Sequence, residues 1–188
     1  TPAISDPGED LVRLCAASGV SVLSIPGCCA AVSALAVSGL PTGRFTFEGF
    51  LTTNKKSRRE HLQSLLNERR TMVFHEAPHK LCTTLTDLCE AFGPDRNIAL
   101  CRELTKLHEE TMRTTLGEAV RFYQDHAPKG EYVLVLAGAE LAQQPQFTLS
   151  DGVERVMGLK AQGARMKDAV RQAAEEMELS RNELYQAV

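Results

Sequence analysis

Two histidines and a glutamate in the stretch TMVFHEAPHK, residues 71–80, have the spacing H-E-x-x-H. Metalloproteases use this spacing on one unbroken helix, where both histidines bind zinc and the glutamate acts as base. Here Pro78 lies inside that turn, and proline breaks a helix because it lacks the backbone N–H. Four strand-forming residues precede the motif. The sequence therefore predicts a strand, a loop and a helix that begins at Pro78, with no metal held by His75 and His79.

Ionisable side chains follow two of the predicted strands. Glu76 and His79 follow the run TMVF, and Glu103 and Lys106 follow the run IALC. Proteins with alternating strands and helices commonly build their sites at the ends of strands. We expect the two runs to be neighbours in one sheet, so that these four candidate catalytic side chains line one cleft. The alternative is a set of ordinary ion pairs, such as Lys106 with a glutamate three or four residues further on.

The elements that would position these residues belong to an α/β fold. In residues 1–43, helix 11–17, strand 20–25 and helix 30–37 alternate as they do around a parallel sheet, and we interpret this part as the remainder of a parallel-sheet α/β domain. Residues 44–140 contain strands at 45–50, 71–75, 97–102, 110–115 and 132–136 with helices between them. This pattern predicts a second α/β domain with a mixed sheet.

The end of the chain loses the strand signal. After the polar, linker-like residues 143–146, residues 147–188 alternate helical stretches with short breaks. Ser180 is a predicted N-cap, and Glu183 would complete a capping box. We predict a small helical module similar to a helix-turn-helix, for which both simple packing and RNA contact remain open.

Composition limits the class of protein. The chain has 188 residues, 43% of them hydrophobic, and a net charge of −3, which argues against nonspecific coating of nucleic acid. No apolar run approaches a membrane span and no signal peptide is visible, so we expect a soluble cytoplasmic protein. The six cysteines form no C-x-x-C pair and are predicted to be small core residues. Lys55, Lys56, Arg58 and Arg59 form a basic patch that would suit RNA, or alternatively a solvated helix face.

Six ordered blocks of the sequence carry a family resemblance. They are TPAISDPG, PGCCAAVSALAVSGLP, RFTFEGFL, EAPHK, RELTKLHEE and KGEYVLVLAG. In this order and spacing they resemble the ribosomal RNA small-subunit methyltransferase I family, within the tetrapyrrole methylase-like superfamily, over nearly the whole chain. The resemblance implies transfer of a methyl group from S-adenosylmethionine to the 2′-hydroxyl of a cytidine in 16S ribosomal RNA. It also implies that an N-terminal part is missing, since TPAISDPG normally completes a loop against the cofactor.

The same resemblance assigns the cofactor contacts. By position they are Thr1, Pro2, Ile4, Cys29, Ala30, Ala77, Leu104 and Gly138. Small residues such as Cys29 and Ala30 allow a close approach between backbone and ligand, although Cys29 could also be an ordinary core thiol. Ala77, Leu104 and Gly138 each end a predicted strand. With the cofactor loop cut, we expect an incomplete cofactor pocket in this chain.

Two other functions remain open at this point, because a fold alone does not determine a function. One is methylation of a tetrapyrrole, and the other is a truncated RNA-binding or partner-binding fragment without activity. The basic patch and the helical end favour RNA. The resemblance further implies a homodimer, and methyl transfer from S-adenosylmethionine requires no metal because the cofactor is already activated.

Overall fold

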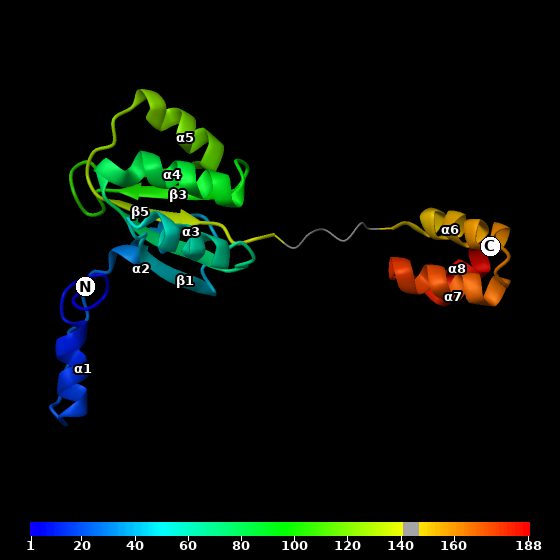
Figure 1. Ribbon diagram of the computed structural model, residues 1–188, viewed down its shortest axis with the longest axis horizontal. Coiled ribbons are helices and arrows are strands. Elements are labelled where there is room, and N and C mark those ends of the chain that lie inside the picture. The colour runs from blue at the N-terminus through cyan, green and yellow to red at the C-terminus, as the bar shows by residue number, and fades with distance from the viewer. Residues whose placement is uncertain (141–146) are drawn as a thin grey trace. The chain divides into compact units, whose positions relative to one another are not determined.

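The structure, a computed structural model, describes residues 1–140 and 147–188 (Figure 1). These residues fall into two compact units, Thr1–Ala139 and Glu140–Val188. The predicted linker at residues 143–146 lies outside the described residues. The predicted domain boundary after residue 43 lies inside the first unit and stays a prediction.

A five-stranded mixed sheet forms the centre of the first unit, with the strand order β1-β2-β5-β3-β4. The strands are β1 (Phe45–Phe50), β2 (Thr71–Glu76), β3 (Asn97–Arg102), β4 (Glu110–Thr115) and β5 (Tyr132–Leu136). β1 and β2 are parallel, whereas β5 is antiparallel to both β2 and β3, and β4 is antiparallel to β3. The predicted α/β fold with a mixed sheet is confirmed.

Helices cover both faces of this sheet (Figure 1). The helices of the first unit are α1 (Glu9–Ala17), α2 (Ala30–Val37), α3 (Lys55–Ser64), α4 (Pro78–Phe92) and α5 (Leu116–Asp125). Phe74 and Leu134 pack in the core under α3, α4 and α5, whereas Val73 and Val133 point to the opposite face and pack on α2. Since side chains alternate along a strand, β2, β3 and β5 are apolar on both faces.

The strand–loop–helix prediction for the H-E-x-x-H stretch is confirmed. β2 ends at Glu76 and α4 begins at Pro78, which occupies the first turn where a missing backbone N–H costs nothing. From there α4 buries one stripe of side chains against the sheet, namely Leu81, Leu85, Leu88 and Phe92. His75 and His79 therefore lie on different elements.

The predicted strand at residues 20–25 does not form. The segment from Val20 to Cys29 has no regular secondary structure, and Leu23 and Ile25 have exposed fractions of 83% and 86%. A strand requires a partner for its backbone hydrogen bonds, and none of the described strands pairs with this segment. Helix α1 likewise has no buried residue. The apolar residues of this segment favour a strand locally, but this preference does not produce a strand without a neighbouring strand to pair with.

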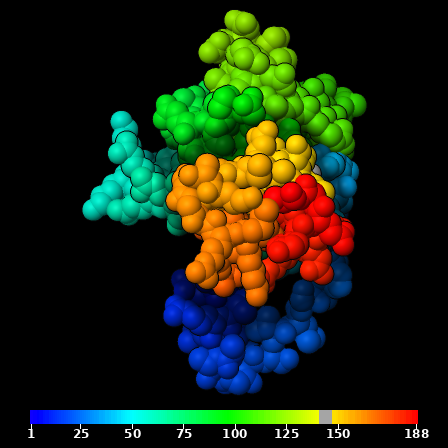
Figure 2. All heavy atoms as spheres, turned by 90° about the vertical axis from the view of Figure 1, so that its right-hand side faces the viewer, coloured from blue at the N-terminus to red at the C-terminus, as the bar shows by residue number. Residues whose placement is uncertain are grey.

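The helices in the described part of the second unit are α6 (Leu149–Ala161), α7 (Met166–Met177) and α8 (Arg181–Ala187). Figure 2 shows their side chains packed together in orange and red, around a small core that includes Val156, Val170 and Leu184. Ser180 caps α8 by accepting a hydrogen bond from the backbone N–H of Glu183, as predicted. The reciprocal bond of a capping box is absent among the described residues. The predicted small helical module is present.

The cysteines differ from their prediction as core residues. All six are free thiols, but only Cys101 is buried, while Cys28 and Cys82 are exposed. Cys28 lies in the segment without secondary structure, which explains why its apolar neighbours do not cover it. Among the described residues, no helix has both the length and the apolar character that crossing a membrane requires.

Candidate functional site

The carboxyl ends of β2 and β3 meet at one edge of the sheet, although the two strands are not neighbours. β5 lies between them, with Tyr132 opposite Glu76 on one side and opposite Arg102 on the other. The prediction that the two runs pair directly was wrong, because the sequence does not show that the last strand inserts between them. Both strands are nevertheless antiparallel to β5, so their ends reach the same edge.

A cavity of about 360 Å³ lies at this edge. Eight of the predicted site residues line it, namely Thr1, Ile4, Ala30, Ala77, Leu104, Glu76, Glu103 and Lys106. The segments that contribute them are separated by up to about one hundred residues in the sequence. His75, Glu131 and Tyr132 also line the cavity and were not predicted as site residues. Glu131 precedes β5 and Tyr132 begins it. Only the antiparallel direction of that strand could have indicated that these two residues lie at the cavity.

Glu103, Lys106 and Glu131 form a charged cluster at the cavity. The Lys106 ammonium donates to Glu103 Oε1 at 3.0 Å and to Glu131 Oε2 at 3.2 Å. These two hydrogen bonds raise the pKa of Lys106, which remains a cation at neutral pH. The backbone N–H of Glu131 and the Lys106 ammonium lower the pKa of Glu103, which remains an anion. Neither Glu109 nor Glu110, the predicted alternative partners, pairs with Lys106 among the described residues. Glu109 accepts a hydrogen bond from the backbone N–H of Thr105, and Glu110 pairs with Arg102.

The backbone holds Glu103 in an unfavourable conformation. Glu103 has φ 50° and Thr105 has φ 65°, a region that side chains with a Cβ seldom occupy. Gly130, with φ 77°, faces Glu103 so closely that a Cβ on it would come within 2.4 Å of Glu103 Cγ. Such backbone strain occurs preferentially at functional sites, where the surrounding structure maintains it. The fold thus forces the Glu103 carboxylate into its place beside Lys106.

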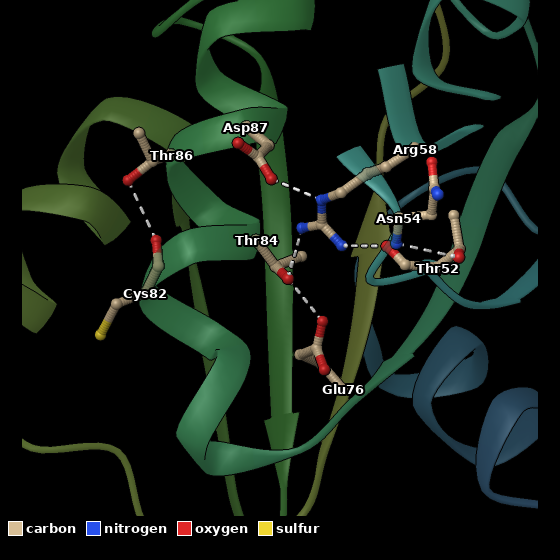
Figure 3. A network of polar contacts seen from close by, with 8 residues as sticks. All are labelled: Thr52, Asn54, Arg58, Glu76, Cys82, Thr84, Thr86 and Asp87. Carbon is tan, nitrogen blue, oxygen red and sulfur yellow. Dashed lines mark hydrogen bonds and ion pairs between the residues drawn. The ribbon is translucent and has the colours of Figure 1, made fainter. Parts of the chain in front are cut away.

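Glu76 is buried in a network of polar contacts that continues to α3 (Figure 3). Its carboxylate accepts from the Thr84 hydroxyl at 2.5 Å and from the backbone N–H of Ala77 at 2.8 Å. The Arg58 guanidinium in turn donates to Thr84 Oγ1 at 2.8 Å and to Asp87 Oδ2 at 2.5 Å. Both oxygens of Glu76 are therefore occupied in this structure. Arg58 is 12% exposed and is not one of the free surface cations.

His79 does not join the cavity, in contrast to the predicted cluster of four residues. Its exposed side chain lines a separate groove between α3 and α4. His79 belongs to the first turn of α4, one residue after Pro78, whereas Glu76 ends β2. Glu76, Glu103 and Lys106 are brought together, and His79 is not.

Three predicted cofactor residues also lie outside the cavity lining. Gly138 follows β5, and because β5 runs antiparallel to β2, Gly138 lies at the opposite sheet edge. There a Cβ on Gly138 would come within 2.2 Å of the Arg69 carbonyl oxygen, which explains the glycine as a packing requirement. Cys29 is the N-cap of α2 and packs in part on the sheet core, and Pro2 is exposed.

His75 packs against aromatic side chains while also lining the cavity. The Phe47 and Phe50 rings meet its imidazole edge to face, at centroid distances of 5.1 and 5.5 Å. Its Nε2 atom is buried without a hydrogen-bond partner. Burial lowers the pKa of His75, so the ring is neutral at physiological pH. In the part of the chain that the structure describes, no three histidine, cysteine or acidic side chains form a group that could hold a metal ion.

The lowered pKa of His75 predicts an acid-sensitive fold. Below the ordinary histidine pKa of 6.5, the unfolded chain takes up a proton that the folded chain resists. Stability is therefore fully present above pH 6.5 and decreases as the pH falls towards the folded-state pKa, by at most about 1.4 kcal/mol per pH unit for one proton. We expect the melting temperature to drop between pH 7 and 5.5, and the drop to shrink in His75→Leu. An identical pH dependence in both proteins would contradict this assignment.

The remaining predicted RNA-binding residues lie on α3. Lys55, Lys56 and Arg59 are exposed. The Lys56 ammonium lies 3.9 Å from Glu60. Asn54 caps the helix by accepting hydrogen bonds from the backbone N–H groups of Lys56 and Ser57, which starts α3 at this cationic end. Three of the four predicted cations are thus surface groups.

Comparison with known proteins shows the family of the chain. Residues 1–120 match the family described as Tetrapyrrole (Corrin/Porphyrin) Methylases. A protein of Synechocystis named ribosomal RNA small subunit methyltransferase I is 46% identical over 99% of this chain and 67% of its own length. The chain belongs to the ribosomal RNA small subunit methyltransferase I family, within the tetrapyrrole methylases. Proteins of the same name from Halalkalibacterium halodurans and Mycobacterium tuberculosis are 40% and 43% identical and are covered over 64% and 65% of their length.

A solved structure supports the fold assignment. The crystal structure of the methyltransferase CobJ matches 73% of this chain and 61% of its own chain, with a TM-score of 0.56 and 21% sequence identity. At that identity the likeness concerns the fold alone. The chain spans about two thirds of the length of the curated relatives named above.

Proposed function

We propose that this chain forms part of an enzyme that transfers a methyl group from S-adenosylmethionine to the ribose 2′-hydroxyl of a cytidine in 16S ribosomal RNA. The relatives named ribosomal RNA small subunit methyltransferase I support a ribosomal RNA substrate. The further detail, the cytidine 2′-hydroxyl, rests on the family resemblance of the sequence blocks.

The observation that carries this proposal is the composition of the cavity at the sheet edge. Five residues that the resemblance assigns to the cofactor line the same cavity as three proposed catalytic side chains. A methyl transfer requires this arrangement, because the enzyme must align the nucleophile with the methyl group and keep water away. Ordinary strand-end ion pairs would not require the small residues Ala30 and Ala77 beside them.

The cavity residues suit a sulfonium cofactor. Ile4, Ala30, Ala77 and Leu104 offer a largely apolar wall, and the side chains of both alanines are short enough to let the backbone approach a ligand. The Glu103 carboxylate offers a negative charge at the same cavity. When bound, S-adenosylmethionine would supply an activated methyl group. Thr1, Ile4, Ala30, Ala77 and Leu104 are the residues that would hold it.

Lys106 and the two carboxylates have different roles in this proposal. A ribose hydroxyl is a very weak acid, so the site must stabilise the developing alkoxide or accept its proton. Lys106 remains protonated and therefore acts as the stabilising cation rather than as a base. Glu103 positions Lys106 through their 3.0 Å contact, and Glu76 orders the backbone at Ala77.

The helical second unit is proposed to add affinity for RNA. It carries Arg155, Lys160, Arg165, Lys167, Arg171 and Arg181. Arg155 is paired with Glu176 at 2.8 Å, which leaves fewer cations for phosphate. Removing residues 147–188 should weaken RNA binding and reduce its salt dependence while leaving cofactor affinity unchanged. Unchanged RNA binding and salt dependence would contradict the role. A cytoplasmic location and a homodimer remain part of the proposal.

Two measurements test the proposed function. Calorimetry with S-adenosylmethionine on this chain and on an N-terminally extended protein tests cofactor binding. Mass mapping of 2′-O-methylation in ribosomal RNA from cells with and without the protein tests the reaction. Loss of one methylated cytidine in the small subunit is the expected result. Cofactor binding together with unchanged ribosomal RNA would instead favour a tetrapyrrole substrate, and absence of cofactor binding in both proteins would favour a binding fragment.

A further inference from the structure

A groove of about 720 Å³ lies between α3 and α4, separate from the cavity at the sheet edge. Its two walls are helical stripes. Lys55, Arg59 and Gln63 follow each other at four-residue spacing along α3, and Lys80 and Thr83 stand opposite on α4. The volume falls within the range of about 300–1,000 Å³ that ligand sites commonly have.

The rim of the groove carries unpaired positive charge. Lys55, Arg59 and Lys80 line it, and among the described residues none of their side chains has an ion pair or a hydrogen bond. Of the two acidic side chains in the lining, Asp87 is paired with Arg58, and Glu90 is an exposed carboxylate. The lining therefore has four lysine and arginine side chains against two carboxylates. The chain as a whole has a net charge of −3, so this surplus of cations is local. It complements an anionic ligand.

The floor of the groove is apolar. Leu62, Leu66 and Ala91 contribute to it, and Leu66 is 42% exposed although it is a large hydrophobic residue. A ligand that satisfies both floor and rim must combine a flat or apolar part with repeated negative charges. Lys55 and Arg59 are separated by about 6 Å along the helix axis, since an α-helix rises about 1.5 Å per residue. This separation suits successive phosphates of an extended strand.

A fixed contact joins the two walls of the groove. Arg58 reaches from α3 to α4 and hydrogen-bonds Asp87 and Thr84, as Figure 3 shows. Because the guanidinium ties the two helices together, the groove is preformed and a ligand need not pay to order it. Arg58 therefore holds α3 against α4, whereas Arg59 and Lys80 remain free to contact a ligand at the rim.

We propose that this groove binds a short stretch of single-stranded RNA, with phosphates at Lys55, Arg59 and Lys80 and one unstacked base against Leu66. The proposal rests on the proposed function in taking RNA as the substrate. It goes further by separating the groove cations from Lys56, which lies on the same helix but outside the groove lining. A duplex would not expose a base to the floor, so single-stranded RNA is the occupant that the floor favours.

The test measures binding of a labelled single-stranded RNA of mixed sequence to the full chain by fluorescence anisotropy at several salt concentrations. Arg59→Ala and Lys80→Ala should each weaken binding about three- to tenfold and lower the salt slope by about one. Leu66→Ala should weaken binding about threefold without changing the salt slope. Lys56→Ala should stay within twofold of the unchanged chain, as should Arg121→Ala, which removes an exposed cation from α5.

Each of the following results would contradict the proposal that the groove binds single-stranded RNA. Equal losses in Lys56→Ala and Arg59→Ala would indicate a diffuse basic patch. Equal affinity for the duplex of the same sequence, or effective competition by an acidic peptide, would remove the role of the base. These outcomes are independent of the proposed function, because binding is measured without methyl transfer. If the double variant Arg59→Ala and Lys80→Ala methylates ribosomal RNA normally, the proposed function stands, and only the proposed RNA binding by this groove fails.

Discussion

Replacing Lys106 with alanine should reduce methyl transfer to small-subunit RNA by about two to three orders of magnitude, the cost of removing one stabilising group for a developing oxyanion. Lys106 lines the cavity, and its pKa is raised by Glu103 and Glu131, so it remains charged. Its ammonium is half-exposed, Glu131 is exposed, and Glu103 keeps its hydrogen bond from the Glu131 backbone N–H. The loss of Lys106 should therefore leave the melting temperature nearly unchanged. The measurement is single-turnover methylation in a preparation that binds S-adenosylmethionine, together with thermal unfolding.

Matched variants separate charge from position. Lys106→Arg keeps the cation and should recover part of the lost rate, whereas Glu131→Gln removes only the more exposed partner and should lower the rate less than Lys106→Ala. Glu103→Gln removes the anion that holds the ammonium and should lower the rate without unfolding the protein. If Lys106→Ala and Glu103→Gln both methylate within a few-fold of the unchanged protein, the cluster is an ordinary strand-end ion pair and the catalytic proposal fails.

Local sequence signals predicted the elements of this site well. The strand run TMVF followed by a proline placed β2 and the start of α4. Most residues there suit their element, with β-branched and aromatic side chains in the strand and proline in the first helical turn. The strand limits 97–102, 110–115 and 132–136 were likewise predicted. Where local preference and burial agree, the sequence is sufficient.

The order and direction of strands could not be derived in the same way. β5 is apolar throughout, which indicates burial on both faces but not which strands flank it or which way it runs. Its antiparallel insertion between β2 and β3 moves Gly138 to the far edge and brings Glu131 to the cavity. One predicted cofactor residue thus lies outside the cavity lining, and one residue that was not predicted lines it. Long-range pairing, and not any local pattern, decided both.

The basic patch illustrates a different limit of sequence reading. Arg58 and Arg59 are adjacent and chemically identical, yet one is tied into the interior and the other is free at a groove. In a helix, successive residues are rotated by about 100°, so two neighbours face different surroundings. Only the position of α4 beside α3 shows which arginine is structural.

Arg58→Ala should lower the stability of the first unit by about 2 to 3 kcal/mol, or roughly 5 to 10 °C in melting temperature. The change leaves the carboxylate of Asp87, 31% exposed, and the hydroxyl of Thr84 without their guanidinium partner. A fully buried pair broken in this way would cost about 3 to 5 kcal/mol, and the partial exposure of Asp87 reduces the figure.

The matched control for this prediction is Arg59→Ala, which removes the same side chain from the next position of α3. Since Arg59 is exposed and has no ion pair among the described residues, its loss should change stability by less than about 0.5 kcal/mol. Thermal unfolding followed by circular dichroism compares the two variants, and RNA affinity is measured well below both transitions. Arg58→Ala should be the less stable protein and Arg59→Ala the weaker RNA binder at low temperature. Equal melting temperatures, together with an equal loss of RNA affinity, would show that Arg58 is a surface contact for RNA and that the contacts to Asp87 and Thr84 do not hold α3 against α4.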